Sequence, residues 1–235
     1  MIVFDNVTLR YPYDEFELLK GVSFSLQEGI NAVLADAQSG KSSICKLLLK
    51  DIAATGGHIF VDGQEISSIT NSNLDILYLP RKPVFFERRS VQYNLEYPLS
   101  VRKVGKSERR ERVREVAELF GIEQLGIKVS KLTQEQRKTL ALARGLTVKR
   151  KTVLFDGFFD GETVDCQYIN SVLQHFDTSA NSTVVIFTSD ARLAMGNTVV
   201  LDGGVTVFQG EAEQAQQCVS NLYWLSHHER NIFKE

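Results

Sequence analysis

The chain has 235 residues, of which 43% are hydrophobic and 24% charged, and its formal net charge at pH 7 is −2. This composition is typical of a globular protein with a full hydrophobic core. The charge balance disfavours a nucleic-acid-binding protein, which usually carries an excess of Lys and Arg. Three widely spaced cysteines favour neither a disulfide framework nor a zinc site. The first residues lack the apolar core of a signal peptide, and no run reaches 18 apolar residues, so we expect a cytosolic protein without a membrane span.

The first third of the chain predicts strands and one helix. Val22, Phe24 and Leu26 alternate with polar residues, as in a half-buried strand. The segment SSICKLLLKDI instead places apolar residues at i, i+3 and i+4, as in a helix. The expected elements are strands at 2–11, 21–27 and 31–34, a helix at 42–52, and a hairpin over 56–66 that turns at Asp62-Gly63.

The middle of the chain, from about 90 to 131, is rich in Arg, Lys and Glu. Apolar residues recur in it at helical spacing: Val113, Val116, Ala117 and Phe120. We expect a small helical insertion here, with Ser107 as its N-cap and Gly121 as its C-cap. The basic residues could form a partner-binding patch, but the interleaved glutamates favour an ordinary solvated helix face.

The last part of the chain alternates helix and strand. This alternation indicates a mostly parallel sheet covered on both faces, and hence an α/β fold. The expected elements are a helix at 134–146, a strand at 152–156, a helix at about 165–176, a strand at 183–188, a short helix, a hairpin around 202–204 and a C-terminal helix from about 211.

The segment ADAQSGKSS, residues 35–43, lies between a predicted strand and a predicted helix. That is the context of a phosphate-binding loop, whose pattern is G-x-x-x-x-G-K-[ST]. Gly40, Lys41 and Ser42 match the pattern. We expect Lys41 at the β- and γ-phosphates and the Ser42 hydroxyl on Mg²⁺. Ala35 stands at the first glycine position, where its Cβ is expected to cost about 1 kcal/mol or to distort the loop.

A second element supports nucleotide binding. VLFDG, residues 153–157, is an apolar strand that ends in Asp156. An aspartate at the end of a neighbouring strand can hold the hydration shell of Mg²⁺. GKS alone is a weak signal, but the two elements together favour a nucleotide site.

With these motifs in order, the whole chain resembles the ATP-binding cassette (ABC) ATPases, the motor domains of ABC transporters. The matching segments are GGHIFVDGQEI, LYLPRKPVFFERRSVQYNLEYPL, KLTQEQRKTLALARGL, VLFDGFFDG, VVIFTSD and TVVLDGGVTVFQG, together with Tyr11 at the family's adenine-stacking position. The resemblance implies a P-loop core with a mostly parallel sheet and an N-terminal antiparallel β subdomain. It also implies a single domain over 1–235, with a helical subdomain inserted at about 88–146.

The chain departs from the family pattern at the positions that carry catalysis. Where the family has glycines in the loop, this chain has Ala35 and Gln38, and where it has the Q-loop glutamine, this chain has Arg81. The family's LSGGQ signature is replaced by LTQEQ at 132–136. Gly157 stands in place of the family's catalytic glutamate, and Ser189 in place of its switch histidine. Gly157 can neither accept a proton nor orient a water, and Ser189 cannot titrate as histidine does. Glu135 would bring a carboxylate close to the phosphates of a second cassette.

The resemblance therefore implies an ATP-binding subunit with little or no hydrolysis. The residues expected at the nucleotide, ATP or ADP, are Tyr11, Ser39, Gly40, Lys41, Ser42 and Ser43, with Ser42 and Asp156 at Mg²⁺ and no intact catalytic residue. The expected partners are a second, intact cassette, more readily than a second copy of the chain, and membrane-spanning permease subunits. The expected location is the inner face of a membrane, on the cytoplasmic side.

Two alternatives stay open. An acid such as Asp160 or Glu162 could supply an unconventional base, which would make the chain an active ATPase. Alternatively, Ala35 and Gln38 could spoil the loop, which would make the chain a scaffold or regulator that binds no nucleotide.

Overall fold

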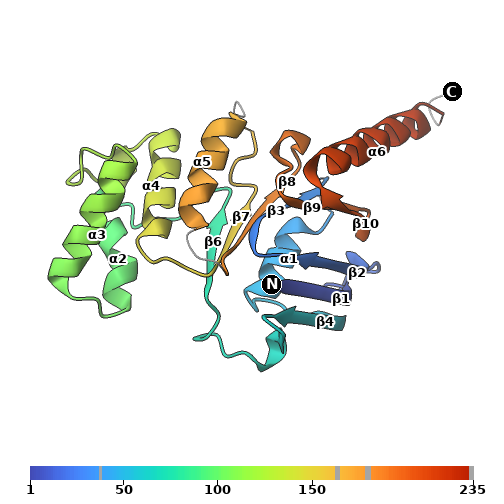
Figure 1. Cartoon of the computed structure of the whole chain (residues 1–235), viewed down its shortest axis with the longest axis horizontal. Coiled ribbons are helices and arrows are strands. Elements are labelled where there is room, and N and C mark those ends of the chain that lie inside the picture. The colour runs from blue at the N-terminus through green and yellow to red at the C-terminus, as the bar shows by residue number, and fades with distance from the viewer. Residues whose placement is uncertain (37–38, 162–164, 178–180, 233–235) are drawn as a thin grey trace. The chain divides into compact units, whose positions relative to one another are not determined.

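The computed structural model describes residues 1–36, 39–161, 165–177 and 181–232. The chain divides into two compact units, one formed by Met1–Tyr78 with Lys151–Glu235 and the other by Leu79–Arg150. Figure 1 traces the chain through both units. In the part of the chain that the structure describes, no helix has the length and apolarity needed to cross a membrane.

The first unit contains an antiparallel sheet of four strands in the order β2-β1-β4-β5. Its strands are β1 (Ile2–Leu9), β2 (Leu19–Leu26), β4 (Gly56–Val61) and β5 (Gln64–Glu65). Val61 pairs with Gln64, which confirms the hairpin predicted at Asp62-Gly63. The strands predicted in the first third of the chain are also confirmed.

A six-stranded sheet with the order β10-β9-β3-β8-β7-β6 forms the centre of the same unit. Its strands are β3 (Gly29–Ala35), β6 (Ile76–Pro80), β7 (Thr152–Asp156), β8 (Thr183–Thr188), β9 (Asn197–Asp202) and β10 (Val205–Glu211). β3, β7, β8 and β9 run parallel, and β10 forms an antiparallel hairpin with β9. Every residue of β7 and β8 is buried, as expected for a parallel sheet covered on both faces. The α/β fold class predicted from the sequence is confirmed.

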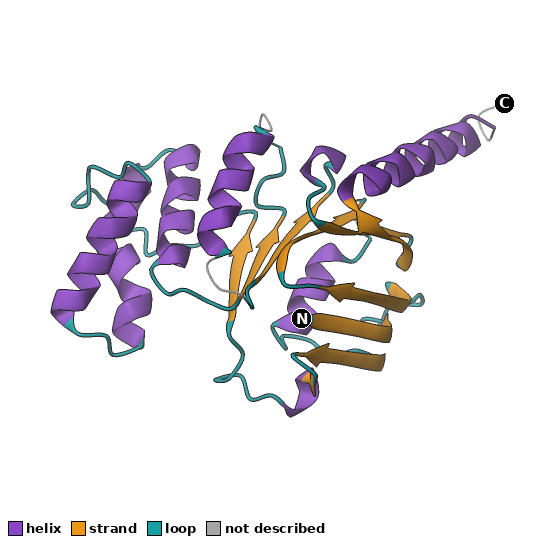
Figure 2. Ribbon diagram, viewed as in Figure 1, coloured by secondary structure: helices purple, strands orange, loops and turns teal. Residues whose placement is uncertain are grey.

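The helices of this unit cover the central sheet (Figure 2). Helix α1 (Lys41–Leu48) contributes to one core with both sheets, because Ile44 and Leu48 pack in the same cluster as Phe4 and Val185. Beyond β9 and β10, α6 (Ala212–Ile232) packs over the opposite face, where Ala215 lies with Leu34. The remaining elements are α5 (Cys166–Phe176) and two 3-10 turns, η1 (Ile66–Ser68) and η3 (Ala191–Leu193).

The second unit consists of helices. They are α2 (Val91–Val101), α3 (Lys106–Leu119) and α4 (Gln134–Leu146), with a 3-10 turn, η2 (Val129–Lys131). Each of the three helices packs against the other two. A bidentate ion pair links Glu87, before α2, to Arg137 on α4, with both N···O distances at 2.6 Å.

Two details of the predicted insertion are wrong. The predicted N-cap, Ser107, lies inside the first turn of α3, because the helix begins at Lys106 after Gly105, which caps it without a side chain. The predicted C-cap, Gly121, is the next residue after the actual C-cap, Phe120. Gly121 has a left-handed backbone that ends the helix. The Gly121 N–H donates to the Glu118 carbonyl, and the Ile122 N–H donates to the Ala117 carbonyl.

Candidate functional site

The loop after β3 leads directly into α1. Gly40 is the N-cap of α1 and has φ +91°, and its carbonyl accepts the first helical bond, from Ile44, at 2.9 Å. A Cβ at Gly40 would lie 2.6 Å from Leu19 Cδ2. Both the backbone angle and the space therefore require glycine at this position.

Ala35 does not produce the strain expected from the sequence. It is the last residue of β3, pairs with Leu201 of β9 and is 7% exposed, so its methyl group belongs to the core. It is also absent from the described residues with positive φ. That expectation was wrong because the tight part of the loop begins after Ala35. Gln38 lies outside the described residues.

The Lys41 side chain turns back into the loop. Its ammonium donates hydrogen bonds to the Ala35 carbonyl and, at 2.7 Å, to the Asp36 carbonyl. Burial lowers the pKa of Lys41, and attraction from the Asp160, Asp36 and Asp156 carboxylates partly offsets this effect. The Lys41 ammonium thus lies within electrostatic range of three carboxylates.

Asp156 and Ser42 lie side by side. The Ser42 hydroxyl donates to Asp156 Oδ1 at 3.0 Å, and the Tyr78 hydroxyl donates to Asp156 Oδ2 at 2.8 Å. Asp156 is only 8% exposed, so these hydroxyls satisfy a carboxylate that water barely reaches. Burial and the bond to Asp156 raise the pKa of Tyr78, which keeps its hydroxyl protonated as a donor.

Tyr78 was not identified from the sequence. It lies on β6, an edge strand of the central sheet that the sequence also did not predict. The available signal was a tyrosine inside the short apolar run ILYLP. That run gives no hint of its distant partner, Asp156.

Tyr11 lies beside α1. Its hydroxyl is 3.0 Å from the hydroxyl of Ser43, which is 7% exposed. The Lys46 ammonium lies 5.9 Å from the centre of the Tyr11 ring, within the range of a cation–π contact. Ser39 is buried next to Gly40. The structure thus gathers the residues predicted for nucleotide binding around the start of α1.

Gly157 and Ser189, which the sequence places at the family's base and switch positions, directly follow β7 and β8. Gly157 follows Asp156 with φ +59°, and its N–H donates to the Phe187 carbonyl at 2.8 Å. Asp160 accepts a hydrogen bond from the Thr188 hydroxyl. The exposed Ser189 lines a small recess of about 30 Å³ together with Ala35 and Asp36. Glu162, the other candidate base, lies outside the described residues.

The LTQEQ segment begins α4 in the second unit. Thr133 is the N-cap, and it forms a capping box with Gln136, in which each side chain binds the other's backbone N–H, at 3.2 and 3.0 Å. Gln134 and Glu135 are exposed in the first turn. Arg81 is exposed directly after β6.

The donor set in the first unit fits a magnesium–phosphate complex. Ser42 and Asp156 offer hard oxygen atoms 3.0 Å apart. Mg²⁺ at phosphate sites usually takes one or two protein oxygens and completes its shell with phosphate and water. Among the described residues, no group of three or more His, Cys, Asp or Glu side chains could hold a metal ion. The fit is therefore to a metal that arrives with a phosphate ligand.

A profile described as ABC transporter matches residues 19–159. The chain belongs to the ABC transporter family.

Solved structures show the same fold. A bacterial Atm1-family ABC exporter with ATP bound has a TM-score of 0.75 and 24% sequence identity, and the match covers 92% of this chain and 39% of the exporter chain. The ATP-binding cassette MJ0796, in a dimeric post-hydrolysis state bound to ADP and Pi, has a TM-score of 0.77 and 21% identity over 90% of this chain and 99% of its own. This chain therefore spans well under half of the exporter and nearly all of the isolated cassette.

Proposed function

We propose that this chain is a cassette subunit that binds ATP or ADP with Mg²⁺ and hydrolyses ATP weakly or not at all. The observation that carries the proposal is the contrast at the end of β7. Asp156 is held by Ser42 and Tyr78, whereas Gly157 next to it has no side chain. In this proposal residues 1–235 form one cassette, with a helical subdomain at about 88–146.

Each binding residue has a role. Lys41 would leave the loop carbonyls for the β- and γ-phosphates, and the N–H groups around Ser39, Gly40 and Ser43 would bind the phosphate chain. Ser42 and Asp156 would hold Mg²⁺, directly or through water, and Mg²⁺ would neutralise phosphate charge. Tyr11 would stack on the adenine.

Weak hydrolysis follows from what surrounds the terminal phosphate. General-base assistance is worth roughly 10²–10⁴ in rate, and Gly157 and Ser189 can supply none. The nearby acid Asp160 is already engaged by the Thr188 hydroxyl. This hydrogen bond ties the Asp160 carboxylate to the last residue of β8, which argues against the use of Asp160 as a free base.

The partner cassette is proposed to be a different chain. In the family two cassettes bind ATP head to tail, and the signature of one faces the loop of the other. In this chain Glu135 occupies the first turn of α4, where its carboxylate would repel phosphate and already interacts favourably with the helix dipole. Two copies would therefore have no intact site, whereas an intact cassette would lend its own signature to this chain.

The membrane-spanning partner is proposed to dock on an exposed aromatic patch of the second unit. Phe86, Tyr93 and Tyr97 are 42%, 38% and 40% exposed. Phe86 packs edge-on against both tyrosines, with its ring centre 5.5 Å from that of Tyr93 and 4.6 Å from that of Tyr97. The Arg89 guanidinium carbon lies 5.0 Å from the centre of the Tyr93 ring. Aromatic residues and arginine are enriched in protein interfaces. Docking there would place the chain on the cytoplasmic face of a membrane.

Nucleotide binding and turnover of the purified chain test the proposal. We expect a fluorescent ATP analogue to bind with Mg²⁺, and Lys41→Ala to abolish binding, whereas Lys106→Ala, the same change at an exposed site on α3, should not. Turnover should not exceed that of Lys41→Ala. Turnover that Lys41→Ala removes would establish the active-ATPase alternative, and absence of binding would establish the scaffold alternative.

Purification from native membranes tests the partners. We expect a permease and an intact cassette to co-purify with the chain. Tyr93→Ala together with Tyr97→Ala should lose the permease and keep nucleotide binding. Recovery of the chain alone, or unchanged recovery of the permease with this variant, would contradict the proposed assembly.

A further inference from the structure

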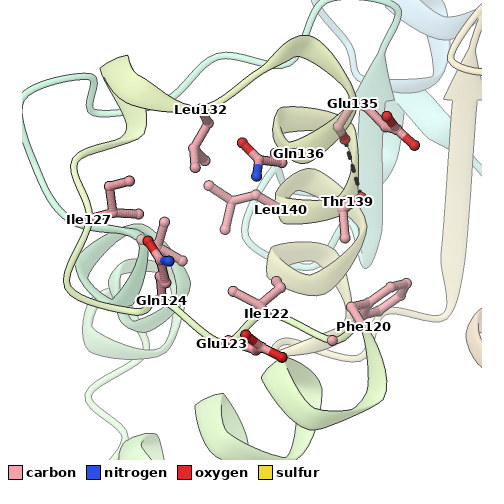
Figure 3. Close-up of a pocket in the computed structure, with 12 residues that line it drawn as sticks. Phe120, Ile122, Glu123, Gln124, Ile127, Leu132, Glu135, Gln136, Thr139 and Leu140 are labelled. Carbon is pink, nitrogen blue, oxygen red and sulfur yellow. Dashed lines mark hydrogen bonds between the residues drawn. The ribbon is translucent and has the colours of Figure 1, made fainter.

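A cavity of about 450 Å³ lies in the second unit, between the first turn of α4, the loop after α3 and the start of α2 (Figure 3). All of its lining residues fall between Val91 and Leu140. The volume is within the range of small-molecule sites, which is about 300–1,000 Å³. The lining includes none of the residues proposed to bind nucleotide.

Half of its lining residues have apolar side chains. They are Val91, Phe120, Ile122, Ile127, Leu132 and Leu140. Val91 and Leu140 are each 1% exposed and form part of the unit's core. Figure 3 shows Ile122, Ile127, Leu132 and Leu140 arranged around the opening. These side chains can pack against the hydrophobic part of a ligand, and the polar groups of the lining lie beside them.

The polar groups of the lining are amides, a hydroxyl and carboxylates. Gln136 accepts the Thr133 N–H through its Oε1 at 3.0 Å, which fixes the side chain and leaves its amide N–H groups for another partner. The Thr139 hydroxyl donates to the Glu135 carbonyl at 3.1 Å. Among the described residues, the carboxylate of Glu123 has no ion-pair partner.

The charge of the lining has one sign. Glu123 and Glu135 line the cavity, and none of the described residues that line it is Lys, Arg or His. In Figure 3 Glu123 lies at the end next to Ile122, whereas the Glu135 carboxylate points away from the apolar side chains. Glu123 is therefore the group placed to receive a charge, and an anionic ligand is disfavoured.

We propose that this cavity binds a small organic cation, an ammonium ion carried on an apolar alkyl or aryl body. The body packs against Ile122, Ile127 and Leu140, and the ammonium group pairs with Glu123 at the rim. Because Glu123 is exposed, the charge supplies selectivity more than affinity. The inference needs neither nucleotide binding nor a partner cassette.

Three probes that share one body test the ligand class. They are 4-phenylbutylammonium, 4-phenyl-1-butanol and 4-phenylbutyrate, each titrated into the full chain with isotope-labelled Ile and Leu methyl groups. We expect shifts confined to the methyls of Ile122, Ile127, Leu132 and Leu140. The ammonium should bind about threefold more tightly than the alcohol, as for an exposed ion pair, and the carboxylate should bind least.

Two variants separate the parts of the site. Ile122→Trp should fill the cavity and abolish binding of all three probes, and its methyl spectrum reports whether the chain still folds. Glu123→Gln should remove the preference for the ammonium and leave binding of the alcohol unchanged. Glu115→Gln, the same change on an exposed part of α3, should keep the preference.

Three results would overturn the proposal. The first is no shift of the lining methyls with the ammonium at millimolar concentration. The second is equal binding of the ammonium and the alcohol to the unmodified chain. The third is loss of the preference in Glu115→Gln as well, which would assign it to the overall charge of the chain.

Discussion

The side chain of Lys41 shows how the charge of the loop is balanced. One ammonium faces the carboxylates of Asp36, Asp156 and Asp160, so the surroundings are negative before any phosphate arrives. A triphosphate adds further negative charge, which Lys41 alone cannot neutralise. We therefore expect nucleotide binding to depend strongly on Mg²⁺.

Removing the charge of Asp36 tests this balance. Asp36 lies in the loop, where its carboxylate would repel the incoming phosphates. We expect Asp36→Asn to tighten MgATP binding about threefold, the size of a solvent-screened charge interaction. Titration of a fluorescent ATP analogue measures the change. Glu28→Gln, the same change at an exposed turn, is the control, and equal tightening there would mean that total charge is responsible.

Removing the Tyr78 hydroxyl tests the support of Asp156. Tyr78→Phe leaves Asp156 Oδ2 without its donor at a site that water barely reaches. We expect a loss of about 1–3 kcal/mol in the free energy of unfolding and weaker Mg²⁺-dependent nucleotide binding. Urea unfolding and nucleotide titration measure the two effects. Tyr13→Phe removes a hydroxyl from a fully exposed side chain and should change neither.

Single residues of the site were predictable only where a local motif names them. Gly40, Lys41 and Ser42 follow from the loop pattern, and Asp156 follows from the end of an apolar strand. Tyr78 and Ala35 were different, because their roles depend on contacts made in the folded chain. The Tyr78 hydroxyl on β6 donates to Asp156 on the neighbouring strand β7, and Ala35 of β3 pairs with Leu201 of β9.

At the scale of elements, α4 begins with a complete capping box. Thr133 and Gln136 satisfy two backbone donors that a helix start otherwise leaves unpaired. The first turn of α4 is therefore stabilised by its own chain. It does not need an external anion for that purpose.

Replacing the cap measures this contribution. We expect Thr133→Ala to cost about 1 kcal/mol and to speed amide exchange in the first turn of α4, because one donor loses its acceptor. Thr133→Ser keeps the hydroxyl and should behave like the original chain. If the serine variant lost as much as the alanine variant, the threonine methyl group would be the stabilising part.

The Glu87–Arg137 ion pair predicts a pH dependence within the second unit. The hydrogen bond from Arg137 lowers the pKa of Glu87. A lowered carboxyl pKa means that the pair stabilises the fold above the unfolded-state pKa, and that this contribution is lost as pH falls through the folded-state pKa. Glu87→Gln should therefore lose less stability on acidification than the original chain. Urea unfolding at neutral and acidic pH provides the comparison, and identical acid sensitivity would contradict the role of the pair.

Elements with strong periodicity were predictable, and elements with mixed signals were not. The segments 134–146, 152–156 and 183–188 match α4, β7 and β8 residue for residue. Helix α2 was missed because Pro98 lies inside it and several of its other residues, two tyrosines, two valines and Asn94, are weaker helix formers. Tertiary contacts compensate there, since the fully buried Asn94 binds both the N–H and the carbonyl of Phe86.

At the scale of the whole molecule, the fold was predictable from the order of the motifs along the chain. Alternating helices and strands after residue 134 predicted the parallel sheet, and the family's matched segments predicted the antiparallel subdomain. What the order of motifs could not supply was the partner. Assembly depends on surfaces, and the exposed signature residues Gln134 and Glu135 depart from the family pattern.

Restoring the signature tests the assembly. We expect the original chain to stay monomeric with MgATP, because Glu135 opposes phosphate in a second copy. Thr133→Ser with Gln134→Gly and Glu135→Gly removes this carboxylate and lets backbone approach, so MgATP should now drive self-association. Sedimentation velocity measures it, with Thr133→Ser alone as the control. Self-association of the original chain with MgATP would refute the expected need for a different partner.

The left-handed backbone at Gly157 has a consequence for how this chain could change over time. Glutamate at φ +59° would be strained by roughly 1–2 kcal/mol, so regaining an acid there requires the end of β7 to reshape around it. A glutamate introduced at this position alone would therefore meet a main chain shaped for glycine, and its carboxylate would be placed only after the backbone had moved.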